Sequence, residues 1–177
     1  MKQRHERHGH PGFVEPSVEA RQTAIMAIRF YSLQDPYGEF SNFSSHPFDL
    51  DGKRWPTSEA YFQACKFDDE AVREQIRLAP SPMKAANLGR SRDFRLRPDW
   101  NEVKDNAMRR ALQAKFAAHP ELQALLLSTG AEPIIEATTD DYYWGCGTRG
   151  DGLNRLGELL GELRTRLRAE QVVTDEG

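Results

Sequence analysis

The sequence predicts one mainly helical domain of the α+β class, with a small β-hairpin or sheet near its N-terminus. The chain has 177 residues, of which 38% are hydrophobic, and this length and composition suit one domain around one core. Apolar residues recur at helical spacing after residue 57, whereas residues 28–55 combine β-prone side chains with turn signals. We expect residues 28–170 to form the domain, with a flexible tail over 1–27 and a flexible C-terminus over 171–177.

The first strands are expected before residue 57. Residues 28–31 are rich in β-prone side chains, and the pattern of residues 48–55 is typical of a hairpin. This hairpin is expected to turn at Asp51-Gly52, because such a pair readily adopts the left-handed backbone of a tight turn. Turn and loop residues over 35–43 separate the first strand from the hairpin.

Helices are predicted for most of the remaining chain, each from a start signal or an apolar stripe. Thr57 or Ser58 caps the first helix, which is expected to run to about Phe67. The other predicted elements follow in chain order: a helix with Val72, Ile76 and Ala79 on one side; a short helix opened by Ser81-Pro82 and closed by Gly89; a long helix opened by Pro98-Asp99-Trp100, with Val103, Ala107, Ala111 and Ala114 along one stripe; a helix between Pro120 and Gly130; a short strand at Ile134-Ile135; and a last helix, capped by Asn154, with Leu156, Leu159, Leu160, Leu163 and Leu167 facing inward.

Composition excludes several classes of protein. The chain has 24 Lys and Arg against 27 Asp and Glu, a net charge of −3, which argues against a general nucleic-acid coat protein. It has no long apolar stretch and no apolar segment of a secretory signal, so we expect a soluble cytoplasmic protein without a membrane partner. Two cysteines cannot form a disulfide framework or a four-ligand zinc site, and three histidines over residues 5–10 are expected to be incidental, so no metal is predicted.

One polar stripe could carry chemistry. Glu59, Gln63 and Lys66 are spaced i, i+4 and i+7, so on a helix they fall on one side. Long side chains at these positions can converge on a ligand between them. The alternative is a solvated stripe opposite a buried face formed by Tyr61 and Cys65, and the pattern alone favours this alternative because charged residues are mostly exposed.

A second candidate lies just before the last predicted helix. Asp140 and Asp141 are followed by three aromatic residues at 142–144 and by four glycines over 145–152. Acids beside aromatic rings suit a site that holds a planar or sugar-like group and moves a proton. A surface turn pinned by aromatic packing explains the same pattern. The glycines could expose backbone N–H groups to an anion.

A basic cluster suggests a phosphate site. Arg90, Arg92, Arg95 and Arg97 lie between two predicted helices, just before Trp100. The guanidinium fork matches the geometry of a phosphate group. A solvated loop is the alternative for any one of these arginines.

Several ordered blocks carry a resemblance to a known family. They include Phe30-Tyr31-Ser32, Tyr37-Gly38-Glu39-Phe40-Ser41-Asn42-Phe43, Trp55-Pro56-Thr57-Ser58-Glu59, Tyr61-Phe62-Gln63-Ala64, Leu88-Gly89-Arg90, Met108-Arg109-Arg110-Ala111-Leu112, Tyr143-Trp144-Gly145 and Asn154-Arg155-Leu156-Gly157. Together they span about residues 28–168, and they resemble the NADAR family, also called YbiA-like. The resemblance implies a single-domain YbiA-like helical fold.

The resemblance also implies an N-glycosidase. Bacterial members are associated with hydrolysis of early riboflavin-pathway intermediates, in which an aminopyrimidine is bonded to ribose 5-phosphate. Other members remove ADP-ribose from guanine bases, so nucleic acid is expected only as a modified substrate. A non-catalytic nucleotide-ribose binding module is a third possibility. No metal or organic cofactor is implied.

Site residues follow from the resemblance by position. The implied catalytic residues are Glu59, Lys66 and Asp141, and the implied substrate-binding residues are Asn42, Gln63, Arg90, Trp100, Trp144 and Asn154. Two positions depart from the family pattern: Ala60 stands where a histidine is common, and Cys146 stands where an acid is common.

The implied chemistry admits two routes. Cleavage of a ribose C1–N bond builds positive charge at C1 and negative charge on the leaving amine. A carboxylate such as Glu59 can stabilise C1 or activate water, and an acid must protonate the amine. Alternatively, Lys66 can form a Schiff base at C1 of the opened sugar. The sequence leaves both routes open.

Overall fold

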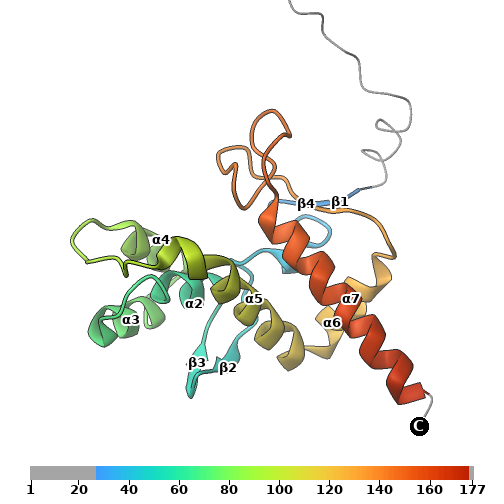
Figure 1. The fold of residues 1–177 in the computed structure, drawn as a ribbon, viewed down its shortest axis with the longest axis horizontal. Helices are drawn as coiled ribbons and strands as arrows, with labels where there is room; N and C mark the ends of the chain where they lie inside the picture. Colours follow the sequence, from blue (N-terminus) through green and yellow to red (C-terminus); the bar gives the residue numbers. More distant parts are fainter. Residues whose placement is uncertain (1–26, 176–177) are drawn as a thin grey trace, which may run out of the picture.

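Helices account for most of the structure, a computed structural model that describes residues 27–175, with side chains to residue 172 (Figure 1). In chain order the elements are β1 (Ile28–Phe30), a 3-10 helix η1 (Gly38–Phe40), β2 (Phe48–Leu50), β3 (Lys53–Trp55), α2 (Ser58–Ala64), α3 (Glu70–Arg77), α4 (Pro82–Arg90), α5 (Trp100–Ala118), α6 (Pro120–Ser128), β4 (Ile134–Glu136) and α7 (Arg155–Asp175). The prediction of a mainly helical fold with small sheets is confirmed. The expected tail falls, up to residue 26, outside the described residues, whereas α7 continues past residue 170. None of the described helices is long and apolar enough to cross a membrane.

Two small sheets lie at opposite ends of the molecule. Strands β2 and β3 form the predicted hairpin, with Phe48 opposite Trp55, and the chain turns through positive φ angles at Asp51 (55°) and Gly52 (73°). Strands β1 and β4 pair in parallel, with Phe30 opposite Glu136. The strand at Ile134 was expected, but its partner was not, because more than a hundred residues separate the two strands in the sequence.

The helix α2 begins as predicted and ends earlier. Thr57 is its N-cap, and the Thr57 hydroxyl accepts a hydrogen bond from the Ala60 N–H at 3.1 Å. The last helical residue is Ala64 instead of Phe67, so Lys66 lies in the turn that follows. All residues of α2 are buried, because α3, α4 and α5 pack around it. The expectation of a solvated stripe on this helix is therefore wrong.

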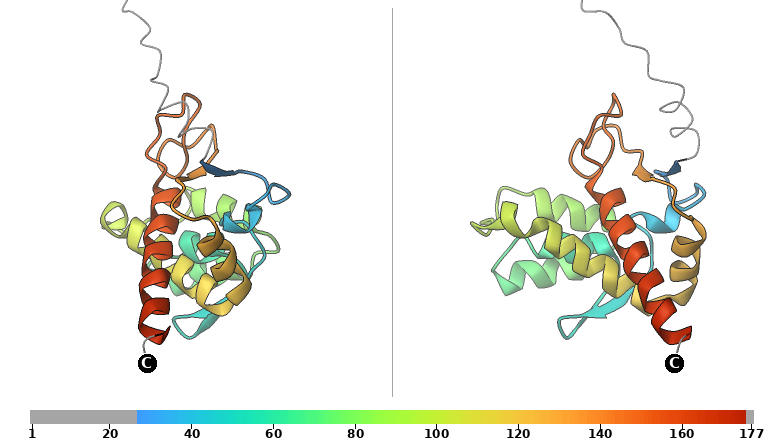
Figure 2. Two further views of the ribbon diagram at one scale, coloured as in Figure 1. Left: turned by 90° about the vertical axis from the view of Figure 1, so that its right-hand side faces the viewer. Right: turned by 45° about the vertical axis from the view of Figure 1, so that its right-hand side comes forward.

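The apolar core has two parts that share α5. One contains β1, η1 and α5–α7, including the five inward-facing leucines predicted for the last helix. The other contains the hairpin and α2–α4, with Trp55, Tyr61 and Ile76 almost fully buried. In Figure 1, α2–α4 lie to the left of α5, and α6 and α7 lie to its right, and the right-hand view of Figure 2 shows the same order. Helix α5 therefore joins the two halves.

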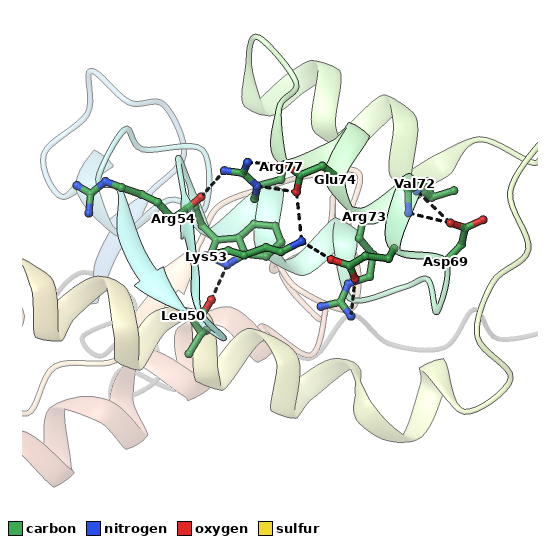
Figure 3. A network of polar contacts seen from close by, with 11 residues as sticks. Leu50, Lys53, Arg54, Asp69, Val72, Arg73, Glu74 and Arg77 are labelled. Carbon is green, nitrogen blue, oxygen red and sulfur yellow. Dashed lines mark hydrogen bonds and ion pairs between the residues drawn. The ribbon is translucent and has the colours of Figure 1, made fainter.

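Polar contacts tie the hairpin to α3 on the surface (Figure 3). Lys53 of β3 lies between Glu70 and Glu74, and the Arg77 side chain donates to the Arg54 carbonyl at 2.9 Å. Asp69 caps α3 by accepting from the backbone N–H groups of its first turn. These groups are largely exposed, so they fix geometry more than they add stability.

Asn154 directly precedes α7, as predicted, and its carbonyl accepts from the Glu158 N–H at 3.0 Å, but its side chain is used elsewhere. Its backbone is left-handed, with φ of 51°. Its side chain reaches β4, where Oδ1 accepts from the Glu136 N–H at 2.9 Å and Nδ2 donates to the Ile134 carbonyl at 2.8 Å. The start of α7 is thus fastened to the small parallel sheet.

We predict that Asn154→Gly and Asn154→Ala both lower the melting temperature, with the larger loss in Asn154→Ala. Both variants lose two hydrogen bonds, each worth about 1 kcal/mol. Alanine also has to adopt the left-handed backbone, which costs it about 1 kcal/mol more than glycine. Thermal unfolding followed by circular dichroism measures both effects. Equal melting temperatures for the two variants would contradict the argument from backbone conformation.

Candidate active site

One large cavity opens between α2, α4, β4 and the loops beside them. Its volume is about 940 Å³, at the upper end of the range for small-molecule sites. It is bordered by Tyr31, Ser32, Leu33, Gln34, Ser41, Asn42, Phe43, Glu59, Phe62, Gln63, Lys66, Met83, Arg90, Met108, Glu136, Thr138, Asp140, Asp141 and Trp144. A second hollow, between α5 and α7, measures only about 180 Å³. The large cavity is therefore the candidate site.

Glu59 lies in the first turn of α2 and borders the cavity. Its backbone N–H donates to the Asn42 carbonyl at 3.0 Å, and its Oε1 accepts from Gln63 Nε2 at 2.7 Å. Only 6% of the residue is exposed. Burial raises the pKa of this carboxyl, although the Gln63 hydrogen bond and the positive charges of Lys66 and Arg90 oppose the shift.

Lys66 is held just beyond the end of α2. Its Nζ donates to the Gly89 carbonyl at 3.2 Å and lies 5.7 Å from the ring centroid of Phe62. Burial lowers the pKa of the Lys66 amine, and the Arg90 charge lowers it further, against the opposing charge of Glu59. Desolvation therefore outweighs the ion-pair attraction, a balance that the sequence left undetermined.

Gly89 allows α4 to approach α2 closely at this point. It is a helical residue inside α4, which ends after Arg90, so the expectation that Gly89 closes the helix is wrong. A Cβ atom at position 89 would overlap the Gln63 amide. The absence of a side chain there gives Gln63 the space in which it reaches Glu59.

Three buried polar atoms at the cavity wall have no hydrogen-bond partner in the described part of the chain. They are Asn42 Oδ1, Gln63 Oε1 and Glu136 Oε2. Buried polar atoms are nearly always satisfied in folded proteins, so such atoms around one cavity indicate a polar ligand or bound water. The three residues come from three different parts of the chain, and all three border the same cavity.

The acidic aromatic loop also contributes to the cavity. Asp141 Oδ1 accepts from the N–H groups of Tyr143 and Trp144, at 2.8 and 2.7 Å. Trp144 packs edge-to-face against Phe62, with ring centroids 5.2 Å apart. The Tyr143 hydroxyl donates to Asp105 of α5 at 2.6 Å. The loop is thus a turn that aromatic packing holds in place. Its residues Asp140, Asp141 and Trp144 also border the cavity.

Seven of the nine residues implied by the resemblance border this cavity: Asn42, Glu59, Gln63, Lys66, Arg90, Asp141 and Trp144. Trp100 does not. Trp100 is the first residue of α5 and is 8% exposed, and the centroid of its ring lies 5.1 Å from that of Phe62. Asn154 is outside the wall too, because its side chain is bonded to β4.

The basic cluster divides in the structure. Of its four arginines, Arg90 borders the cavity, whereas Arg97 pairs with Asp99 at 2.7 Å and Arg92 and Arg95 lie on the connecting loop. Arg90 is therefore the arginine of this cluster that can hold an anion in the site. Among residues 27–172 no three His, Cys, Asp or Glu side chains gather as a metal site would require.

Both departures from the family pattern lie away from the cavity wall. Ala60 is buried in the core cluster that contains the hairpin. The Cys146 thiol is buried beneath the glycine loop, 3.8 Å from an Arg29 nitrogen. Neither side chain borders the cavity, so the substitutions leave its lining unchanged.

The main residue that the sequence analysis missed is Glu136, at the end of β4. Burial raises the pKa of its carboxyl to about 7, and the negative charges of Asp141 and Glu59 add to the shift. A hydrogen bond with Thr138 opposes it. The available sequence signal was an acid directly after two buried-type strand residues, but nothing in the sequence indicated that β4 ends at the cavity.

Comparisons with known proteins identify relatives of the chain. The NADAR domain family model matches residues 29–168. The chain is 56% identical over 144 residues to N-glycosidase YbiA of Escherichia coli (strain K12), covering 81% of this chain and 90% of that protein. It is 42% identical over 146 residues to N-glycosidase Npun_R5314 of Nostoc punctiforme, covering 81% of this chain and 94% of that protein.

A solved structure confirms the likeness in three dimensions. The NMR structure of the E. coli protein YbiA matches with a TM-score of 0.77 and 55% sequence identity. The match covers 82% of this chain and 87% of that one. The fold is therefore one that this chain shares with the solved structure of YbiA.

We predict that ribose 5-phosphate changes the tryptophan fluorescence of the protein and that Trp144→Phe removes most of this change. Trp144 borders the cavity, whereas Trp100 does not. Trp100→Phe should therefore keep the response, and it serves as the matched control. Titration of the three proteins with the sugar phosphate measures the difference. A full response in Trp144→Phe would place the ligand elsewhere.

Proposed function

The chain belongs to the NADAR family, and from this premise we propose that it hydrolyses the C1–N bond between ribose 5-phosphate and an aminopyrimidine. N-glycosidase activity is the activity for which its relatives at 56% identity are named. Other relatives, from Zea mays and Vibrio vulnificus, are named as riboflavin biosynthesis proteins. The observation that carries the proposal is that Glu59, Lys66 and Arg90 all border one cavity.

The cavity offers matching groups for each part of such a substrate. Arg90 supplies a guanidinium for the phosphate. The free amide oxygens of Asn42 and Gln63 can accept hydrogen bonds from ribose hydroxyls. The indole of Trp144 gives the planar base a surface on which to stack. The volume of about 940 Å³ accommodates a ribosylated base with its phosphate.

Two routes to cleavage remain compatible with these positions. In the first, Glu59 takes a proton from water as the water attacks C1. In the second, the sugar ring opens and Lys66 attacks C1, the amine leaves, and water then hydrolyses the imine. The lowered pKa of Lys66 increases the fraction of neutral amine and so favours the second route. The electron pair of the C1–N bond leaves with the amine nitrogen in both.

The alternative functions receive less support. A non-catalytic binding module would not require a carboxyl and an amine to be buried together beside the sugar site, where each is costly to desolvate. Removal of ADP-ribose from guanine in nucleic acid would be helped by a positive surface, and the net charge is −3. We place the enzyme in the cytoplasm as part of the proposal, because both cysteines are unpaired thiols.

The direct test is incubation of the purified protein with the ribosylaminopyrimidine phosphate and, separately, with ADP-ribosylated guanosine. The proposal expects release of ribose 5-phosphate from the first compound and no release of ADP-ribose from the second. Chromatography of the released sugar measures both. Turnover of the second compound alone would overturn the proposed substrate.

We predict that Glu59→Gln lowers turnover by at least about a hundredfold, the usual effect of removing one acid–base group. The amide can still accept the Gln63 hydrogen bond, so the melting temperature should change little. Steady-state kinetics and thermal unfolding are measured on the same preparations. Glu102→Gln, on the exposed side of α5, is the matched control and should keep wild-type turnover. Near-native turnover of Glu59→Gln would remove Glu59 from the mechanism.

We predict that borohydride added during turnover traps a sugar adduct on Lys66. Lys66→Arg keeps the charge but cannot form an imine, so it should be as inactive as Lys66→Ala. Mass spectrometry of the treated protein detects the adduct. An unmodified protein together with an active Lys66→Arg would exclude the covalent route.

A further inference from the structure

Glu136 is one of four carboxyl groups that border the cavity, and the others are Glu59, Asp141 and the exposed Asp140. Glu136 is the last residue of β4, and its side chain borders the cavity. Its Oε2 atom is buried and has no partner among the described residues. A buried carboxyl oxygen that faces a polar cavity and bonds to nothing in the protein is available to a ligand.

The backbone of Glu136 is fixed on both sides. Its N–H donates to Asn154 Oδ1 at 2.9 Å, and its carbonyl accepts from the Cys146 N–H at 2.9 Å. Pairing with Phe30 of β1 fixes the strand from the other edge. The Thr138 side chain bonds to the carboxyl itself. Such support is what a group needs if it is to meet a substrate atom in one orientation.

The charges around Glu136 favour its neutral form. Asp141, on the neighbouring loop, and Glu59, on α2, are both acidic. The arginines of the adjoining elements interact with other groups. The Arg29 side chain of β1 contacts the Cys146 sulfur, and Arg155 of α7 forms an ion pair with Asp105 at 2.7 Å. The pKa of Glu136 is accordingly raised to about 7, first by burial and then by these two acids.

Glu59 stands in a different environment. Its Oε1 accepts from the Gln63 amide, and the positive charges of Lys66 and Arg90 act on it. Asp141 acts as a hydrogen-bond acceptor, because two backbone N–H groups donate to its Oδ1. Burial raises the pKa of Glu59 too, but Glu136 combines a buried carboxyl oxygen without a partner among the described residues with charged neighbours that are acids. Of these carboxyls, Glu136 is therefore the one best suited to donate a proton.

We propose that Glu136 is the general acid of the reaction and donates its proton to the nitrogen of the departing aminopyrimidine. This inference rests on the proposed function. As the C1–N bond breaks, its electron pair stays on nitrogen, the nitrogen takes the proton from Oε2, and Glu136 becomes a carboxylate. Water supplies the hydroxyl group at C1, and its remaining proton restores the acid through Glu59 or solvent. The inference thus assigns the acid to a residue that is not among the three catalytic residues implied by the resemblance.

The role of an acid depends on the leaving group, and this dependence gives the test. N-ribosyl-aniline 5-phosphates can be prepared with electron-rich or electron-poor rings. A poorly basic nitroaniline leaves with little need for a proton, whereas a methoxyaniline needs one. Glu136→Gln should lower kcat at least about a hundredfold for the aminopyrimidine substrate and for methoxyaniline, and less than about tenfold for nitroaniline. KM should change little.

A pH profile supplies the second measurement. The carboxyl must be protonated, so wild-type kcat/KM should fall as pH rises above about 7, the value to which the pKa of Glu136 is raised. This basic limb should be absent from Glu136→Gln. Glu102→Gln, outside the cavity, is the matched control and should keep both the limb and the rate.

The outcomes separate this inference from the proposed function. Wild-type protein that hydrolyses none of these N-ribosides would contradict the proposed function and leave Glu136 without a reaction to serve. An active wild type with an equally active Glu136→Gln would overturn the general-acid role alone. An equal loss for both anilines, with the basic limb retained, would overturn it too, by assigning Glu136 a structural role.

Discussion

The helix α2 is enclosed by α3, α4 and α5, and this enclosure determines what its polar residues can do. Glu59 and Gln63 cannot reach solvent, so their side chains have to satisfy one another and the cavity. Removal of water strengthens the field between the remaining charges and shifts each protonation equilibrium toward the neutral form. The chemical capacity of the cavity therefore follows from the packing of a helix of seven residues.

A buried lysine supports the loop that closes the other side of the cavity. Lys115 of α5 donates to the carbonyls of Glu39 and Ser41, at 2.6 and 3.1 Å, and to the Ser44 hydroxyl at 2.6 Å. The loop between these acceptors carries Asn42, whose carbonyl receives the Glu59 N–H. Burial lowers the pKa of Lys115 to about 7. One lysine amine thus organises the backbone segment that leads from η1 toward β2.

The sequence predicted local structure well and tertiary contacts poorly, for a physical reason. The hairpin follows from Asp51-Gly52 and the start of α2 from Thr57, because both signals act within a few residues. The sequence pattern predicts Gly89 as a helix end, because the reason for a glycine there lies in another helix. Its missing side chain leaves space for Gln63 of α2. Glu136 was missed because its placement depends on a strand pair between distant segments. Sequence spacing placed Glu59, Gln63 and Lys66 on one side of the helix, but it did not show that Glu59 and Gln63 are buried.

The neutral state of Glu136 links the proposed chemistry to stability. Its pKa is near 7 in the folded protein and near 4.5 as a free side chain, so folding binds a proton between these values. Because the pKa of Glu136 is higher in the folded protein, the free energy of unfolding is greatest below the pKa of the unfolded chain. It decreases by up to about 1.4 kcal/mol per pH unit as the pH rises from there through the pKa of the folded protein. A well-packed apolar residue at this position would avoid that loss. Keeping a carboxyl there is understandable if the cavity needs a proton donor near neutral pH, where a free glutamate would already be ionised.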